Sequence, residues 1–98
     1  MRRRSRGIHP GEILVAEFMR PLRLDEAKLA AALGVPVRRL ALLVQGKRPL
    51  SAEIDLRLTR YFGLPEGFFL RLQLEYELES AKLRLGPRVE AEVTPLAA

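Results

Sequence analysis

The sequence predicts an all-α protein with a single domain. With 98 residues, of which 48% are hydrophobic, the chain has the size of one domain with one core. Apolar residues recur at helical spacing from Ile13 to Leu85, and Gly and Pro residues divide this stretch into short segments. Because the chain has no cysteine, disulfides and thiolate metal sites are excluded, and the core depends on packing alone.

The first expected helix begins in the segment His-Pro-Gly-Glu, residues 9–12. Proline is favoured in a first helical turn, and an acid there interacts well with the positive end of the helix dipole. Ile13, Leu14 and Phe18 follow at helical spacing, and Pro21 is expected to end the helix. His9 is the only histidine, so we expect a structural or capping role for it rather than metal binding or catalysis.

Two short helices should follow, joined by a tight turn. Asp25 is the expected N-cap of the second helix, and Gly34 can adopt the left-handed conformation that ends it. Pro36 lies where a third helix would begin, and Gly46 would stop that helix.

The spacing within residues 26–45 is that of a helix-turn-helix. Ala30 is small where a second helix must pass close, Gly34 lies at the turn, and Leu40 and Leu43 would lock the next helix onto the first. Ordinary helical hairpins share this pattern, so the motif alone does not decide the function.

Two further helices complete the expected fold. Ser51 precedes the fourth helix, whose inner face would be Ile54, Leu58 and Phe62 and which Gly63 would end.

The fifth helix is expected from Pro65 to Leu85. Apolar residues alternate over 70–78 as in a strand, but we favour helix because the run has no turn signal and is rich in Leu, Glu and Arg. Gly86-Pro87 is expected to end it. This helix carries a second apolar stripe, which is either core or, as we favour, an interface with a subunit or partner: Leu74, Leu78, Ala81 and Leu85.

Positive charge is concentrated in the N-terminal half. Residues 1–50 contain eleven Lys and Arg against four Asp and Glu, a balance of +7, whereas residues 51–98 contain six against eight, a balance of −2. A concentrated positive field suits a polyphosphate partner, since each neutralised phosphate releases counterions. A soluble protein with an uneven surface is the alternative interpretation.

We divide the chain into a basic arm (1–7), a helix-turn-helix domain (8–85) and a flexible tail (86–98). The arginines of the arm would enter a DNA minor groove, contact an acidic partner or, as charged termini usually do, remain a solvated tail. No stretch resembles a signal peptide or spans a bilayer, so we expect a cytoplasmic protein. No nucleophile, metal-ligand or acid–base pattern is present, so we expect neither an enzyme nor a cofactor.

Several segments carry a family resemblance: residues 8–14 (IHPGEIL), 33–36 (LGVP), Arg39, 44–48 (VQGKR), 56–58 (LRL), 62–63 (FG) and 68–70 (FFL). Over about residues 8 to 83 the chain thereby resembles the HigA-type antitoxins of the phage-repressor-like (XRE) helix-turn-helix superfamily. The His-Pro-Gly-Glu opening and the Gly-Lys-Arg loop are the most specific parts of this likeness.

The resemblance implies a five-helix domain of the lambda-repressor type. It further implies an antitoxin of a type II toxin–antitoxin system that forms a homodimer, binds operator DNA to repress its own operon, and neutralises a RelE-like ribonuclease toxin. The implied partners are therefore double-stranded operator DNA, the toxin protein and a second copy of the chain.

The resemblance also puts the recognition helix at Pro36 to Gln45. It implies five base-reading residues, which are Val37, Arg38, Arg39, Ala41 and Leu42, and five phosphate-binding residues, which are Lys28, Gln45, Lys47, Arg48 and Ser51. The chemistry of these residues agrees in part, because an arginine can donate two N–H groups to guanine O6 and N7 and loop cations can reach phosphates.

The sequence departs from the family pattern at two places. Relatives commonly have Asn and Glu where this chain has Ala41 and Leu42, which offer only apolar contact, for example to thymine methyl groups. Relatives also begin the second helix with Ser-Gln, whose amide contacts DNA, whereas this chain has Asp25-Glu26. Carboxylates beside phosphates are repelled unless they are turned away or paired, for example with Lys28 or Arg23.

Two alternative functions follow from these departures. One is a free-standing helix-turn-helix repressor without a toxin. The other is a protein-binding module of the same fold that has lost sequence-specific DNA binding, with Leu42 facing a protein.

Overall fold

The computed structural model describes residues 8–97, and in this range every regular element is a helix. The first helical segment consists of α1 (Pro10–Ile13), a π-helical stretch η1 (Leu14–Met19) and α2 (Arg20–Leu22). The segments α3 (Glu26–Leu33), α4 (Val37–Val44), α5 (Ala52–Phe62) and α6 (Phe68–Glu92) follow. The predicted all-α fold with five helices is confirmed, whereas the predicted basic arm lies outside the described residues.

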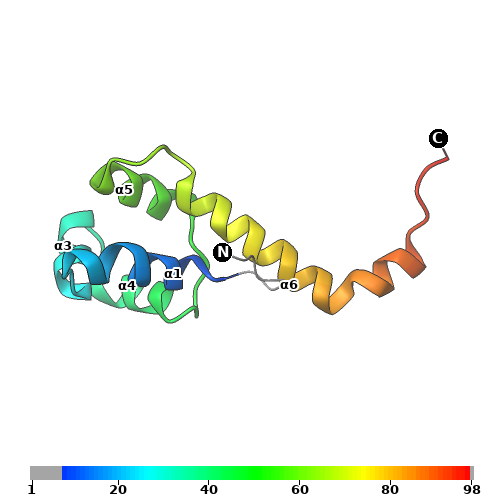
Figure 1. Ribbon diagram of the computed structural model, residues 1–98, viewed down its shortest axis with the longest axis horizontal. Coiled ribbons are helices and arrows are strands. Elements are labelled where there is room, and N and C mark those ends of the chain that lie inside the picture. The colour runs from blue at the N-terminus through cyan, green and yellow to red at the C-terminus, as the bar shows by residue number, and fades with distance from the viewer. Residues whose placement is uncertain (1–7, 98) are drawn as a thin grey trace.

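The helices from α1 to α5 form a bundle together with the start of α6. The rest of α6 leaves the bundle as a long arm (Figure 1). The molecule measures 52 × 25 × 23 Å. With 25 residues, α6 is about 37 Å long at 1.5 Å per residue. The N-terminal part of α6 therefore belongs to the bundle, and its C-terminal part extends beyond it.

One hydrophobic core holds the bundle together, and every helical segment contributes to it. Among its fully buried members are Leu14 of η1, Leu29 of α3, Leu40 of α4, Leu58 of α5 and Phe69 of α6. Phe18 packs on this cluster with its ring 4.9 Å from that of Phe62 and 5.4 Å from that of Phe69. The helix-turn-helix is thus fixed from both sides by the elements before and after it.

The predicted helix boundaries are confirmed at four caps. The Asp25 carboxylate accepts a 2.8 Å hydrogen bond from the Lys28 backbone N–H, and the Ser51 hydroxyl accepts one of 3.3 Å from the Ile54 N–H. Gly34 and Gly63 end α3 and α5 with left-handed φ angles of 74° and 71°. The helical assignment of residues 70–78 is confirmed as well, because α6 contains them all.

His9 has the capping role expected of it. Its Nδ1 atom accepts a 2.9 Å hydrogen bond from the Gly11 backbone N–H, and the side chain is buried. The imidazole ring also packs edge-on against Tyr76 of α6, with 5.0 Å between ring centroids. His9 therefore starts α1 and joins it to α6.

The prediction that Pro21 ends the first helix is wrong. The helix continues to Leu22 and ends at Arg23, which has a left-handed φ of 56°. A proline ring clashes with the carbonyl four residues earlier and has no N–H to donate. Directly before Pro21, the Arg20 N–H bonds to Val15 O, five residues back, and this wider π-helical turn accommodates the proline.

The prediction that Gly86-Pro87 ends the last helix is also wrong. Helix α6 continues to Glu92, so residues 86–92, which we expected in a flexible tail, are helical. Pro87 lies within the helix, and Figure 1 shows α6 changing direction in its orange part. An exposed ion pair of 3.1 Å between Arg88 and Glu92 supports the turns after the bend.

No helix within residues 8–97 has both the length and the apolar character that a bilayer-crossing segment needs.

Candidate nucleic-acid interface

The helix-turn-helix is formed by α3, the residues Gly34, Val35 and Pro36, and α4. Ala30 is buried where the helices approach, and its carbonyl accepts hydrogen bonds from the N–H groups of Gly34 (2.9 Å) and Val35 (3.1 Å). This pairing closes α3 and turns the chain sharply into α4. The predicted motif is therefore present in the structure.

The solvent-facing side of α4 is centred on Arg38. Leu40 and Leu43 are buried and fix the opposite side against the core. Successive residues of a helix are rotated by about 100°, so Arg38 lies almost directly opposite these two leucines. Val37 and Arg38 are exposed, and the side chains on the flanks, Ala41 and Leu42, are half-buried.

Arg39, the second expected base reader, lies on a flank of α4 and is engaged in an ion pair. Its Nη2 atom is 3.1 Å from Oε1 of Glu53 in the first turn of α5. The other carboxylate oxygen of Glu53 accepts a 3.1 Å bond from Arg57 Nε. Arg57 Nη1 in turn donates to the carbonyl of Leu33, the last residue of α3, at 2.8 Å. This network joins both helices of the motif to α5.

The network also affects the acidity of Glu53. Hydrogen bonds from Arg39 and Arg57, with the positive charge of both guanidinium groups, lower the pKa of this carboxyl below its ordinary value. Glu53 is therefore ionised at neutral pH, with its negative charge beside the two guanidinium groups.

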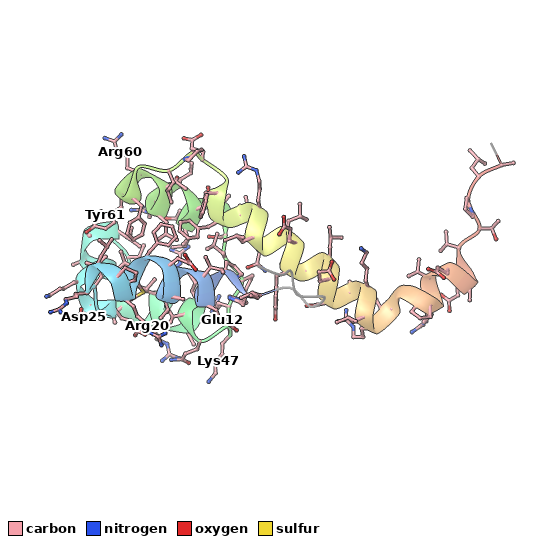
Figure 2. All side chains as sticks on the ribbon, in the orientation of Figure 1. Glu12, Arg20, Asp25, Lys47, Arg60 and Tyr61 are labelled. Atoms are coloured by element: carbon pink, nitrogen blue, oxygen red, sulfur yellow. The ribbon has the colours of Figure 1, made fainter. Side chains whose placement is uncertain are left out.

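The expected phosphate-binding residues are all exposed: Lys28, Gln45, Lys47, Arg48 and Ser51. Lys28 lies in the first turn of α3, Gln45 caps the end of α4, and Lys47 and Arg48 lie in the loop before α5. Figure 2 shows Lys47 and Arg20 projecting from one side of the bundle, while Arg60 projects from the opposite side.

The loop that carries Lys47 and Arg48 is anchored at both ends. At its start, Gly46 has a φ of 76° and the Lys47 N–H bonds to Leu42 O at 2.9 Å. At its end, the Leu50 N–H donates a 2.8 Å hydrogen bond to Oε1 of the buried Gln73 on α6. The exposed side chains of Lys47 and Arg48 therefore lie on a loop whose backbone is held at both ends.

Gln73 and Glu53 are two residues that sequence reasoning missed. Gln73 is the single amide side chain of α6, and it occupies an inward position where apolar residues prevail. Such an isolated polar residue at an inward position signals a buried hydrogen-bond partner. Glu53 offers no comparable signal, because its partner Arg39 belongs to another helix.

Gly11 allows α1 and α4 to touch through their backbones. A Cβ atom at this position would overlap the carbonyl oxygen of Leu43 and come within 3.1 Å of Val44 Cα. Only glycine fits this contact. The position of α4 therefore depends on the His-Pro-Gly-Glu segment at the start of α1 as well as on α3.

The two carboxylates at the start of α3 are accommodated differently. Asp25 is occupied as the N-cap, and Glu26 is half-buried. In the described part of the chain, neither forms the ion pair with Lys28 or Arg23 that we considered from the sequence. The Asp25 carboxylate instead accepts its hydrogen bond from the Lys28 backbone N–H of its own helix.

The surface around α4 offers guanidinium, ammonium, hydroxyl and amide groups. Residues 8–97 contain no group of three His, Asp or Glu side chains placed to hold a metal ion.

Comparison with known proteins relates this architecture to a group of bacterial regulators. No family model matches the chain. Virulence-associated protein I of Dichelobacter nodosus is 41% identical over 75 residues, which cover 76% of this chain and 69% of that protein.

Two solved structures have the same fold over nearly the whole chain. The antitoxin HigA of Pseudomonas aeruginosa, solved with the higBA promoter, has a TM-score of 0.89 and 40% identity, covering 94% of this chain and all of that one. The antitoxin GraA in complex with its operator has a TM-score of 0.91 and 33% identity, covering 100% and 99% of the two chains.

Proposed function

The chain belongs to the HigA-type antitoxins of the phage-repressor-like helix-turn-helix superfamily, and we propose that it binds operator DNA at its own promoter through α4. The observation that carries this proposal is the position of Arg38 at the centre of the exposed face of the second helix of the motif. A guanidinium group there can donate two hydrogen bonds to one guanine in the major groove. The solved HigA and GraA structures that share this fold were obtained with promoter or operator DNA.

The phosphate contacts of this complex would come from residues around α4. Lys47 and Arg48 are exposed on their anchored loop, and Lys28 is exposed on α3. The Ser51 hydroxyl accepts a bond from the Ile54 N–H, so its own proton remains available to a phosphate oxygen. Such contacts fix the protein on the duplex without reading sequence.

A palindromic operator requires two copies of the chain, and we assign the interface to the second apolar stripe of α6. Leu74 and Leu78 are 57% and 54% exposed, and Ala81 and Leu85 are half-buried beyond the bundle. Their spacing of four, three and four residues is that of a coiled-coil seam. Pairing these seams would bury the stripe and hold two copies of α4 about 34 Å apart, one helical turn of DNA.

The second activity in the proposal is neutralisation of a RelE-like ribonuclease toxin by direct contact. It rests on family membership together with the charge of the chain, since residues 51–98 have a balance of −2. That sign suits a ribonuclease, which must be basic to bind RNA.

DNA binding is tested by fluorescence anisotropy with the native upstream promoter and a scrambled duplex, each at low and physiological salt. Tight binding that prefers the promoter supports the repressor function. Equal, weak and strongly salt-dependent binding to both duplexes would instead favour a protein-binding module of the same fold, with Leu42 facing a protein.

The dimer is tested by light scattering after size-exclusion chromatography. Leu78→Glu places a charge in the seam, so we expect a monomer and weaker operator binding. Leu83→Glu is the matched control, because Leu83 is 63% exposed but lies outside the seam. If Leu78→Glu remains dimeric, the α6 interface is wrong.

The toxin is sought in the open reading frame beside the gene. Growth arrest on expression of that frame, relieved by co-expression of this chain, and co-purification of the two proteins would support the antitoxin function. If no such frame exists, the free-standing repressor is the better description.

A further inference from the structure

We propose that Glu53 is a positioning residue: it holds Arg39 away from DNA, so that Arg38 alone reads guanine and the affinity for DNA of any sequence stays low. The inference rests on the proposed DNA-binding function and deepens it. It concerns a residue on α5, outside the helix-turn-helix itself.

The first support is the direction in which the two neighbouring arginines point. Arg38 is exposed on the outer face of α4, whereas Arg39 is rotated by about 100° toward α5. From there its guanidinium group meets the Glu53 carboxylate at 3.1 Å. Two adjacent arginines of equal chemistry therefore occupy different environments before any DNA arrives.

The second support is that the Glu53 carboxylate is itself fixed in place. Arg57, one turn further along α5, binds its second oxygen at 3.1 Å. Arg57 is in turn held by its 2.8 Å hydrogen bond to the Leu33 carbonyl. The ion pair is partly exposed, with 41% and 53% of the two side chains accessible, so a phosphate that attracted Arg39 would compete with a carboxylate that Arg57 already orients.

The consequence for DNA binding follows from the counterion effect. An unpaired arginine at the edge of α4 can reach a backbone phosphate on any sequence, and it then raises the affinity for all DNA alike. The operator and random-sequence affinities rise by the same factor, so their ratio stays the same while more of the protein is held on random DNA. By pairing with Arg39, Glu53 removes one such contact and keeps the affinity for random-sequence DNA low.

The test compares the salt dependence of binding to the promoter and to a scrambled duplex for the wild type and four variants. In Glu53→Gln, Arg39 is released, so we expect the slope of log K against log salt to steepen by about 0.9 on both duplexes. The affinity for both duplexes should rise by a similar factor, so the promoter preference should stay the same. Arg39→Gln should leave the wild-type slope unchanged.

Two further variants separate release of Arg39 from a general change of charge. Glu53→Asp keeps the negative charge but withdraws the carboxylate, so it should steepen the slope as Glu53→Gln does. In the double variant Glu53→Gln, Arg39→Gln the steepening should disappear, since the freed arginine is missing. Circular dichroism checks that each variant folds.

Three results would overturn the inference. If Arg39→Gln flattens the wild-type slope, Arg39 contacts DNA already. If Glu53→Gln matches the wild type, or if its gain persists in the double variant, release of Arg39 is not the cause. A wild-type protein that prefers no duplex would instead refute the proposed function, and the two failures are therefore distinguishable.

Discussion

The carboxylate of Asp55, on α5, accepts a 2.9 Å hydrogen bond from the backbone N–H of Phe69 in the first turn of α6. The same carboxylate accepts the N–H groups of Gly67 at 2.6 Å and Leu70 at 3.0 Å. Gly67 is the N-cap of α6 and has no side chain, so Asp55 satisfies the free N–H groups of α6 from a neighbouring helix. The direction of α6 is thereby tied to α5.

Asp55→Ala should therefore destabilise the fold strongly. It leaves three backbone N–H groups without their buried acceptor, and we expect a loss of about 3 kcal/mol in the free energy of unfolding. For a domain of this size the midpoint temperature should fall by about 15 °C. Asp55→Asn, which keeps one acceptor oxygen, should lose less. Thermal unfolding followed by circular dichroism measures both, and a wild-type midpoint for Asp55→Ala would contradict the capping role.

Two glycines should respond differently to substitution by alanine. In Gly11→Ala the new methyl group overlaps the backbone of α4 at Leu43, so we expect a loss of about 1 to 3 kcal/mol and weaker promoter binding. In Gly86→Ala the new methyl group meets no atom of another helix, and the helix preference of alanine is opposed by the restriction that Pro87 places on a preceding residue with a Cβ, so we expect only a small change in stability. Urea denaturation of both variants tests the pair. A loss in Gly11→Ala no larger than that in Gly86→Ala would argue against the close approach of α1 and α4.

Arg38 and Lys47 should contribute differently to DNA recognition. Arg38→Ala should cost about 1 to 3 kcal/mol on the promoter and less on a scrambled duplex, because it removes a base contact. Lys47→Ala should weaken binding to both duplexes alike and flatten the salt slope by about one, because it removes a phosphate contact. Anisotropy titrations at several salt concentrations measure both effects. Equal losses on both duplexes for Arg38→Ala would refute base reading.

The ion pairs of Glu53 should make the free energy of unfolding depend on pH in the acidic range. The variant Glu53→Gln, which lacks them, isolates this contribution. Because the folded-state pKa of Glu53 is lowered, its contribution is present above the ordinary glutamate pKa and is lost as the pH falls through the lowered value. The wild type should therefore be more stable than Glu53→Gln at neutral pH, and the difference should vanish in strong acid. Urea denaturation from neutral to acidic pH tests this. A difference that does not change with pH would contradict the paired state.

Most of the helix boundaries could be predicted because their signals are local. Asp25 and Ser51 cap helices through bonds to residues only three positions away, and Gly34 ends α3 by its own conformation. The start of the last helix was predicted three residues too early, because α6 begins at Phe68 and not at Pro65. The predicted ends at Pro21 and Pro87 were wrong as well. At these two prolines the neighbouring backbone adapts, by a π-helical turn or by a bend, and no residue type signals that adaptation.

For the candidate site, the family likeness and the chemistry of Arg, Lys and Ser gave a set of candidate residues around α4 but not their arrangement. In the structure Val37, Arg38 and the five expected phosphate-binding residues are exposed, whereas Arg39, Ala41 and Leu42 are half-buried. The sequence treats Arg38 and Arg39 as equivalent, because a guanidinium group on either can bind guanine. The structure separates them, since only Arg39 lies within 3.1 Å of a carboxylate from another helix.

By itself, the sequence determined the fold class, the helix-turn-helix, the caps and the basic half of the chain, because periodicity, capping chemistry and charge are properties of neighbouring residues. The tertiary structure alone decided four contacts. The Asp55 carboxylate binds the first N–H groups of α6, and the Gln73 side chain binds the Leu50 N–H in the loop that carries Lys47. Gly11 touches the backbone of α4, and Glu53 lies between two arginines. Each joins a helix to another helix or to a loop that is distant in the sequence. Such contacts depend on how the helices pack, and no local pattern of residues encodes that packing.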